Sequence, residues 1–250
     1  MLIPFLICFF ASAVGAICGI GGGVVIKPLL ELFLDLPITV IHFLSSSTVL
    51  CMSAYSVGSS VGKGDRKIDF AIGTPLAVGA ACGGIVGKKL FSCFAESVSV
   101  LQSWLLIAAM LACLVYTIWQ EKFPSFCVRS TIGCALAGLA LGIFSGFLGI
   151  GGGPINLMVL MLCFAMDSRK ASVHSLYVIL FSQSASFIIT ISNGLPEVDL
   201  WMLGLMSIAG ILGGIVGRCI HKTIRDTTLK VLLIGSIIGV VVASSMNLLM

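Results

Sequence analysis

The sequence predicts an all-α integral membrane protein of two inverted repeats, each a glycine-broken helical hairpin followed by three transmembrane helices. Apolar residues make up 58% of the 250 residues and charged residues only 10%, with a mean hydropathy of +1.17. A chain of this composition has too little polar surface to cover a soluble globule. The sequence also repeats itself, and its basic residues are distributed unevenly between the predicted loops.

Apolar runs near the bilayer-spanning length of about 20 residues predict the membrane helices. They are residues 38–61, 70–87, 100–119, 172–192, 200–217 and 231–249. Two longer runs, 2–36 and 131–166, each contain a glycine cluster, and glycine weakens a helix interior by roughly 1 kcal/mol relative to alanine. The pieces on either side of the first cluster are short for a hydrocarbon core of about 30 Å. We therefore expect a hairpin or broken helix pair in each long run.

The first of these runs, at the N-terminus, is expected to be a mature membrane segment. It has an apolar core followed by small residues, but it lacks the basic start of a secretory signal, and a similar pattern recurs in mid-chain.

Three pairs of motifs predict an internal duplication. The sequence GIGGG occurs at Gly19–Gly23 and again at Gly149–Gly153, 130 residues later. At the same offset GGIVG recurs, from Gly83–Gly87 to Gly213–Gly217, and GDRKID at 64–69 aligns with GLPEVD at 194–199. A constant register over three matches indicates two homologous halves, about 1–125 and 126–250, within one transmembrane domain.

Lysine and arginine predict how the two halves are oriented, because cytoplasmic loops are enriched in both. If each broken run enters and returns on one side, the loops of one side carry 11 basic residues and those of the other carry 2. A single crossing per run would give 5 and 8. The first arrangement makes the halves inverted copies in the cell membrane, with both termini non-cytoplasmic. This arrangement places Lys88 and Lys89 on the non-cytoplasmic side, against the general trend for basic residues.

The glycine breaks predict a binding site within the membrane. Irregular backbone is tolerated there only where it lines a cavity or is buried in protein. A helix that begins after a break presents unpaired N–H groups and a partial positive charge, and Pro154 suits the first position of one such helix. Two such N-termini brought together near the midplane would bind a small anion. Close helix packing is the alternative, and we favour it for the GGIVG pair.

Ionisable residues inside the apolar runs are functional candidates because they are costly in a membrane. Lys27 lies one turn beyond the first break and would supply a positive charge, although snorkelling or pairing with Glu31 would also explain it. Glu31 and Asp35 are expected at an interface. His42 and His174 would exchange protons during transport, or else serve as hydrogen-bonded structural residues.

Neutral donors near the breaks complete the candidate site. Neutral hydroxyl and amide groups can hold an oxyanion without trapping it, and the sequence offers them at Ser45–Thr48, Ser175, Tyr177, Ser182 and Gln183, although serines often bond back to their own helix. The predicted binding residues are Gly19, Gly21, Gly22, Gly23, Lys27, Ser45, Ser46, Ser47, Gly149, Gly151, Gly152, Gly153, Pro154, Asn156 and Ser175. The ten cysteines lack metal or disulfide spacing and are expected to be small buried apolar residues. No metal, cofactor or nucleic-acid partner is expected.

Taken together, these motifs resemble the TauE/SafE family of membrane permeases. The resemblance covers nearly the whole chain: a G-x-G-G-G element early in each half, Pro28 beyond the first, a G-x-x-x-hydrophobic-Asp loop in each half, and a later glycine-rich helix. The family often has an Ala-x-x-Thr-Ser or Thr-Asn type element after the first broken segment, which Ser45–Ser47 and Ser175 only approximate. The resemblance implies a transporter of sulfur-containing anions such as sulfite, sulfonates or thiosulfate.

The sequence therefore predicts a secondary transporter that moves a small inorganic or organic anion across the lipid bilayer by alternating access. It contains no P-loop for ATP. A carrier for a small cation or neutral solute is the first alternative. An intramembrane serine enzyme using Ser145 and His174 is the second, and a structural subunit is the third. A homo-oligomer is compatible with the sequence.

Overall fold

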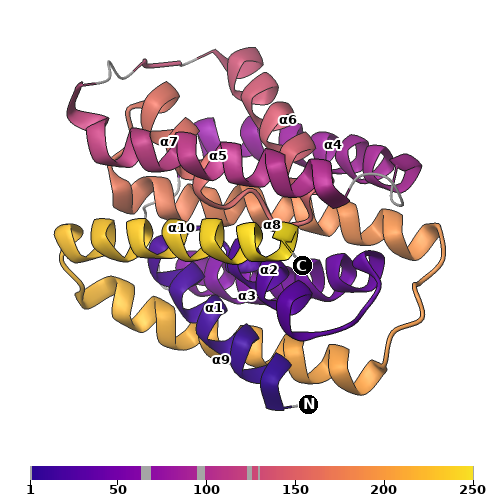
Figure 1. Cartoon of the computed structure of the whole chain (residues 1–250). Helices are drawn as coiled ribbons and strands as arrows, with labels where there is room; N and C mark the ends of the chain where they lie inside the picture. Colours follow the sequence, from indigo (N-terminus) through magenta and orange to yellow (C-terminus); the bar gives the residue numbers. More distant parts are fainter. Residues whose placement is uncertain (1, 63–68, 95–98, 123–125, 129, 250) are drawn as a thin grey trace.

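The described part of the chain is entirely helical, which confirms the predicted fold class. The computed structural model describes residues 2–62, 69–94, 99–122, 126–128 and 130–249, and in these ranges it contains ten α-helices, one 3-10 turn and no strand (Figure 1). The helices are α1 (Leu2–Cys18), α2 (Gly23–Phe33), α3 (Ile38–Gly62), α4 (Phe70–Phe94), α5 (Ser99–Trp119), α6 (Thr131–Leu148), α7 (Gly153–Phe164), α8 (Ser168–Ser192), α9 (Leu200–Thr223) and α10 (Asp226–Leu249), with the 3-10 turn at Gln120–Lys122.

Seven of the helices are long and apolar enough to cross a membrane, namely α3, α4, α5, α6, α8, α9 and α10. Each of the six predicted spanning runs lies inside one of them. Many large apolar side chains are exposed on their outer surfaces, including Trp104, Trp119 and Trp201, as expected for a surface that faces lipid. The chain is a multi-pass membrane protein.

Several helices are longer than the apolar runs that predicted them, and this corrects the assignment of some loops. α4 continues to Phe94 and α9 to Thr223, while α8 already begins at Ser168. Lys88 and Lys89 therefore lie inside α4 rather than in a loop. A run of apolar residues stops at the first charge, whereas a helix continues for as long as its backbone hydrogen bonds are made.

The helix boundaries recur at the offset of the sequence repeat. α3 and α8 match end to end at 130 residues, and α4 and α9 begin at matching positions. The packing also recurs, because α1 packs on α9 while its equivalent α6 packs on α4. Helices that correspond at this offset therefore pack on partners that also correspond. Of the repeated motif GDRKID, residues 64–68 lie outside the described residues.

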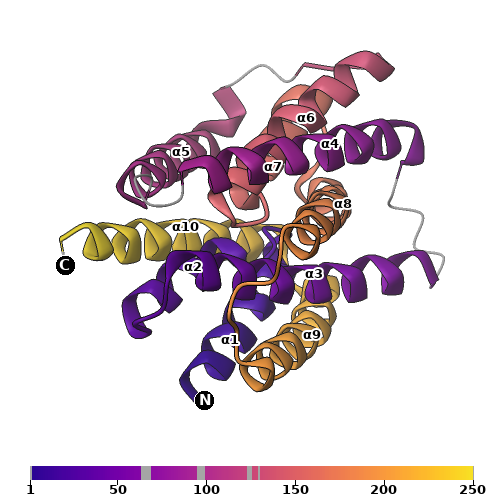
Figure 2. The same ribbon diagram turned by 90° about the vertical axis from the view of Figure 1, so that its right-hand side faces the viewer.

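The helices are arranged in two groups with two helices between them. In Figures 1 and 2, α4 to α7 gather on one side, α1 to α3 and α9 gather on the other, and α8 and α10 lie between. α5 and α10 pack together and run antiparallel. Val100 at the start of α5 shares a pocket with Leu248 at the end of α10, while Thr117 near the end of α5 shares another with Leu229 near the start of α10.

Glycines of the GGIVG motifs lie where two helices touch. A Cβ on Gly83 would lie 2.2 Å from the carbonyl oxygen of Leu139 in α6, and one on Gly213 would lie 2.4 Å from that of Phe9 in α1. These contacts confirm that the motif allows close packing.

The expectation that the cysteines are buried is wrong in part: Cys82, Cys93, Cys127 and Cys219 are exposed.

Candidate functional site

The two glycine breaks adopt nearly the same backbone conformation. α1 ends at Cys18 and α2 begins at Gly23, while α6 ends at Leu148 and α7 begins at Gly153. Gly19 and its equivalent Gly149 have φ values of 76° and 68°, and Gly21 and Gly151 have 78° and 76°. L-residues with side chains rarely adopt these left-handed values. The glycines are therefore required for the two chain reversals.

The two breaks contact each other, as the sequence predicts for convergent interruptions. A Cβ on Gly23 would lie 2.7 Å from the carbonyl oxygen of Ile150, and one on Gly153 would lie 3.6 Å from that of Ile20. Every residue of both breaks is buried. The structure thus brings two interrupted helix pairs, 130 residues apart in sequence, to one place inside the protein.

Two equivalent apolar side chains from the long central helices close over the breaks. Val49 of α3 lies against Gly23 and Gly151, and Ile179 of α8 lies against Gly21 and Gly151. Residues 49 and 179 are separated by the repeat offset of 130. The conformation is therefore a closed one, in which the glycines are covered by side chains.

Side chains from distant helices satisfy the last carbonyl groups of the helices that end at the breaks. At the first break, the single hydroxyl proton of Ser172 is shared between Cys18 O at 2.9 Å and Ser168 O of its own helix at 2.7 Å, and His221 Nδ1 donates to Ile17 O at 2.6 Å. A helix C-terminus leaves such carbonyls without an intrahelical partner.

At the second break, different residue types fulfil the same role. Lys27 Nζ donates to Leu148 O at 2.9 Å, and Gln102 Nε2 donates to Phe147 O at 2.6 Å. Leu148 and Phe147 are the repeat equivalents of Cys18 and Ile17. Both helix ends are therefore stabilised by tertiary contacts, but only the second receives a lysine.

The N-termini of α2 and α7 face the breaks without a capping side chain. Gly22 and Gly152 occupy the N-cap positions, and neither helix has a side-chain cap hydrogen bond. Pro154 lies in the first turn of α7, as the sequence predicts. The side-chain amide of Asn156 lies against Gly152, at 2.5 Å from where a Cβ would be, and its Oδ1 has no partner within the described residues. Neither helix start therefore has a side-chain cap, although in α2 the N–H groups of Gly23 and Val25 donate to Gly21 O and Gly22 O within the break.

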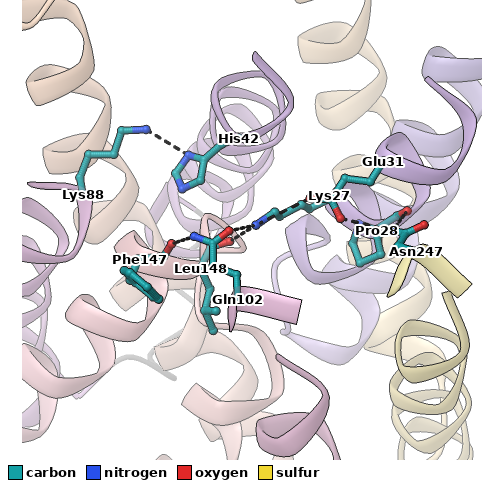
Figure 3. Close-up of polar contacts among 9 residues, drawn as sticks. All are labelled: Lys27, Pro28, Glu31, His42, Lys88, Gln102, Phe147, Leu148 and Asn247. Carbon is teal, nitrogen blue, oxygen red and sulfur yellow. Dashed lines mark hydrogen bonds and ion pairs between the residues drawn. The ribbon is translucent and has the colours of Figure 1, made fainter. Parts of the chain in front are cut away.

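Lys27 is buried in a chain of polar contacts that Figure 3 shows. Only 4% of its surface is exposed, and Nζ donates to Gln102 Oε1 at 2.9 Å in addition to Leu148 O. Glu31 Oε1 lies 3.9 Å from Nζ, and Asn247 Nδ2 donates to Glu31 Oε2 at 3.3 Å. Lys27 therefore does not snorkel to an interface. It has a loose ion pair with Glu31 and points toward the second break.

The predicted serines divide into two kinds. Ser47 donates to Phe43 O of its own helix at 2.8 Å, which is the alternative foreseen for such residues. The hydroxyls of Ser45, Ser46 and Ser175 are buried and lack a hydrogen-bond partner among the residues described. Ser45 precedes Val49 by one helical turn, and Ser175 likewise precedes Ile179, so both lie on helix faces directed toward the breaks.

The two histidines have different surroundings. The ring of His42 packs against Gly149, with Nε2 2.2 Å from where a Cβ would be. His174 instead accepts from Asp69 N at Nε2 over 3.0 Å and donates from Nδ1 to Lys170 O over 2.9 Å. Nε2 of His174 is thus engaged with the backbone just before α4 and Nδ1 with the backbone of its own helix α8, and of the two histidines only His42 lies at a break.

A family model described as "Sulfite exporter TauE/SafE" matches residues 4–246. The chain belongs to the TauE/SafE family. It is 24% identical over 262 residues to "Probable membrane transporter protein YunE" of Bacillus subtilis (strain 168), a match that covers 89% of each chain. No solved structure matches the chain. Membership in the TauE/SafE family makes this protein a membrane transporter.

The alternative of an intramembrane serine enzyme is wrong for this TauE/SafE member. A catalytic serine needs a base within hydrogen-bond reach. Ser145 accepts instead from Gln183 Nε2 at 3.0 Å, and both nitrogens of His174 bind backbone groups.

Two residues at the site are absent from the sequence-based prediction. Gln102 is a buried amide that donates to Phe147 O at the second break, and its signal was a lone amide inside an apolar run. Gln183, which the sequence offers as a neutral amide donor, is likewise buried beside this break. Lys88 is buried in α4 and contacts His42 at 3.1 Å. The sequence signal for Lys88 is its position directly after GGIVG. This motif lies where α4 packs against α6.

Proposed function

We propose that this transporter moves a small sulfur-containing oxyanion, such as sulfite, a sulfonate or thiosulfate, by alternating access at the two glycine breaks. The observation that carries the proposal is the meeting of the breaks at one buried place, with Lys27 directed at the second of them. Uncapped helix N-termini and a buried cation attract anions. The binding residues are those predicted from the sequence, apart from Ser47, whose hydroxyl is used within α3.

The charges near the breaks favour an anion over the alternative of a small cation. Lys27 reaches Leu148 with its ammonium group, and in the described part of the chain its carboxylate neighbour, Glu31, is 3.9 Å from Nζ and turned toward Asn247. A cation site in a membrane protein would need acidic or carbonyl ligands aimed at the centre. The carbonyls at both helix ends are already occupied by donors.

The arrangement of equivalent helices supports the proposal that the two halves are inverted copies. α5 and α10 are equivalents and run antiparallel. The first residues of α3 line the same pocket as the first residues of α5. The first residues of α8 instead line a pocket with the last residues of α5. The helices α3 and α8 therefore begin at opposite ends of the molecule. An inverted pair of this kind can expose its shared site alternately to the two sides.

A pocket of about 810 Å³ provides a route on one side. Its lining includes Glu31, Ile38 and Ile41, so it reaches the carboxylate that lies 3.9 Å from Lys27 Nζ. The C-terminal residues Asn247 and Leu248 line the same pocket. With both termini non-cytoplasmic, as the distribution of basic residues predicts, this pocket opens to the outside.

Counterflow in proteoliposomes tests the function. Vesicles loaded with unlabelled sulfite should accumulate radiolabelled sulfite, and external thiosulfate or a small sulfonate should compete, whereas protein-free vesicles should not accumulate label. Uptake of a labelled monovalent cation and of a labelled neutral solute of similar size is measured in the same way, to test the two alternative kinds of carrier. Uptake of either of these, together with no uptake of any sulfur oxyanion, would contradict the proposal.

The orientation is tested separately with a protease-cleavable tag at each end of the chain in intact cells. Cleavage of both tags from outside agrees with the proposed topology. If both tags are protected, the assignment of the two sides is reversed. If only one tag is protected, the chain crosses the membrane an odd number of times, which excludes the inverted arrangement.

A further inference from the structure

Lys88 of α4 forms a cluster with two rings at one side of the second break. Its Nζ lies 3.1 Å from Nδ1 of His42 and 5.1 Å from the centroid of the Phe91 ring. His42 stacks on Phe91 with 4.4 Å between ring centroids. Lys88 is 9% exposed and His42 is 1% exposed. In Figure 3, Lys88 and Lys27 approach His42 and Leu148 from opposite sides.

The direction of the Lys88 hydrogen bond determines the tautomer of His42. An ammonium group has only donors, so Nδ1 accepts and the ring proton of a neutral His42 resides on Nε2. Nε2 is buried, and in the described part of the chain no acceptor meets it with full hydrogen-bond geometry; it lies toward the backbone of Gly146 and Gly149. The cluster therefore directs the N–H donor of His42 at the second break.

The charge of Lys88 lacks a protein counter-ion within the described residues. Lys27 has Glu31 at 3.9 Å, but no described carboxylate lies within 4.0 Å of Lys88 Nζ. The Phe91 ring offsets part of the cost of burying the ammonium group. A buried cation is otherwise stabilised by an opposite charge, and in a transporter that charge can belong to the cargo.

We propose that Lys88 and His42 bind the transported anion together with Lys27. This inference rests on the proposed function and adds a residue from α4 to the site. The ligand class is an oxyanion with at least two acceptor oxygens, one for the ammonium group of Lys88 and one for Nε2 of His42. In the closed conformation the two side chains hold each other. An arriving oxyanion takes over the Lys88 hydrogen bond as the site opens.

Three substitutions test the proposal against a matched control. Lys88→Met removes the charge, Lys88→Arg keeps it, and His42→Phe removes both ring nitrogens while retaining the stack on Phe91. Lys89→Met is the control, because Lys89 is the exposed neighbour on the same helix and its loss changes the net charge equally. Each variant is purified and checked for a single monodisperse peak.

The first measurement is the concentration of sulfite that half-saturates counterflow. We expect it to rise about tenfold or more in Lys88→Met and in His42→Phe, the effect of losing one hydrogen bond to a charged group. Lys88→Arg should be intermediate, and Lys89→Met should match the wild type. Unchanged half-saturation in a folded Lys88→Met variant overturns the proposal. If that variant does not fold, the same result for His42→Phe overturns it.

The second measurement separates this proposal from the proposed function. Sulfite should raise the thermal unfolding temperature of the wild type and of Lys89→Met in detergent, but not that of Lys88→Met. If sulfite stabilises the wild type but not Lys88→Met, and the wild type moves no anion in vesicles, the binding site is supported and the proposed transport of a sulfur oxyanion is refuted. Equal stabilisation of wild type and Lys88→Met would refute the site even if transport is found.

Discussion

The contact between the two breaks can be tested by adding a single methyl group at Gly23. In Gly23→Ala the new Cβ would lie 2.7 Å from the carbonyl oxygen of Ile150 and 2.8 Å from Cγ2 of Val49. The contact with Val49 can relax by rotation of its side chain. The contact with Ile150 cannot, because that oxygen belongs to the backbone of the other break and sits about 0.7 Å closer than an ordinary contact. Gly23 does not have a positive φ, so the effect is steric.

Overpacking of this kind typically costs about 1–3 kcal/mol. We expect Gly23→Ala to lower the free energy of unfolding by about 2 kcal/mol, which changes the ratio of folded to unfolded protein about 30-fold. Gly58→Ala is the matched control, since a Cβ at Gly58 in α3 meets nothing within 4 Å. Alanine is favoured over glycine in a helix by up to about 1 kcal/mol, so the control should be neutral or stabilised.

The assay is unfolding in mixed micelles at increasing SDS, followed by circular dichroism, together with sulfite counterflow on the same preparations. Gly23→Ala should unfold at lower SDS than wild type and transport more slowly, because separating the breaks alters the site they share. Equal stability of Gly23→Ala and Gly58→Ala, with wild-type flux in both, would show that the breaks do not depend on close contact.

Three further substitutions, the last with a matched control, test other parts of the structure. Gly83→Ala places a Cβ 2.2 Å from Leu139 O in α6, so it should cost at least as much as Gly23→Ala, about 3 kcal/mol, and broaden the size-exclusion peak; a wild-type profile would contradict the packing described. His174→Ala leaves Asp69 N and Lys170 O without this partner and should lower the free energy of unfolding by about 1–3 kcal/mol, with half-saturation of transport unchanged; a shifted half-saturation would place His174 in the site. Ser45→Ala should raise the half-saturating sulfite concentration about two- to tenfold, whereas Ser47→Ala, whose hydroxyl is used within α3, should have little effect, and equal behaviour would refute the distinction.

Much of the helical framework can be predicted from the sequence, because it follows from local signals. Lipid-spanning helices require long apolar runs, and the duplicated GIGGG motif marks both breaks where only glycine tolerates the left-handed backbone. Pro154 marks the start of α7 for an equally local reason. These features depend on a few adjacent residues, so a pattern in the sequence is sufficient to find them.

The tertiary contacts at the breaks could not be predicted in the same way. Gln102 meets Phe147 and Lys27 across large sequence separations, and no local pattern encodes such a pairing. Lys88 and Lys89 look alike in the sequence, where they end an apolar run. Adjacent residues on a helix point about 100° apart, so one of them is buried and the other is exposed.

The two breaks share a backbone but differ in charge, and this difference has a consequence for where an anion binds. Residues 27 and 102 correspond to Leu157 and Leu232 in the second half, and His42 corresponds to Ser172. The cationic groups therefore gather at Leu148 and Gly149, while the equivalent positions at the first break are served by neutral Ser172 and by His221. The duplicated glycines supply the shape of the site, and the diverged side chains supply its charge. Under the proposed function, an anion attracted by Lys27 and Lys88 would lie nearer the second break than the first, and the two halves would contribute unequally to its binding.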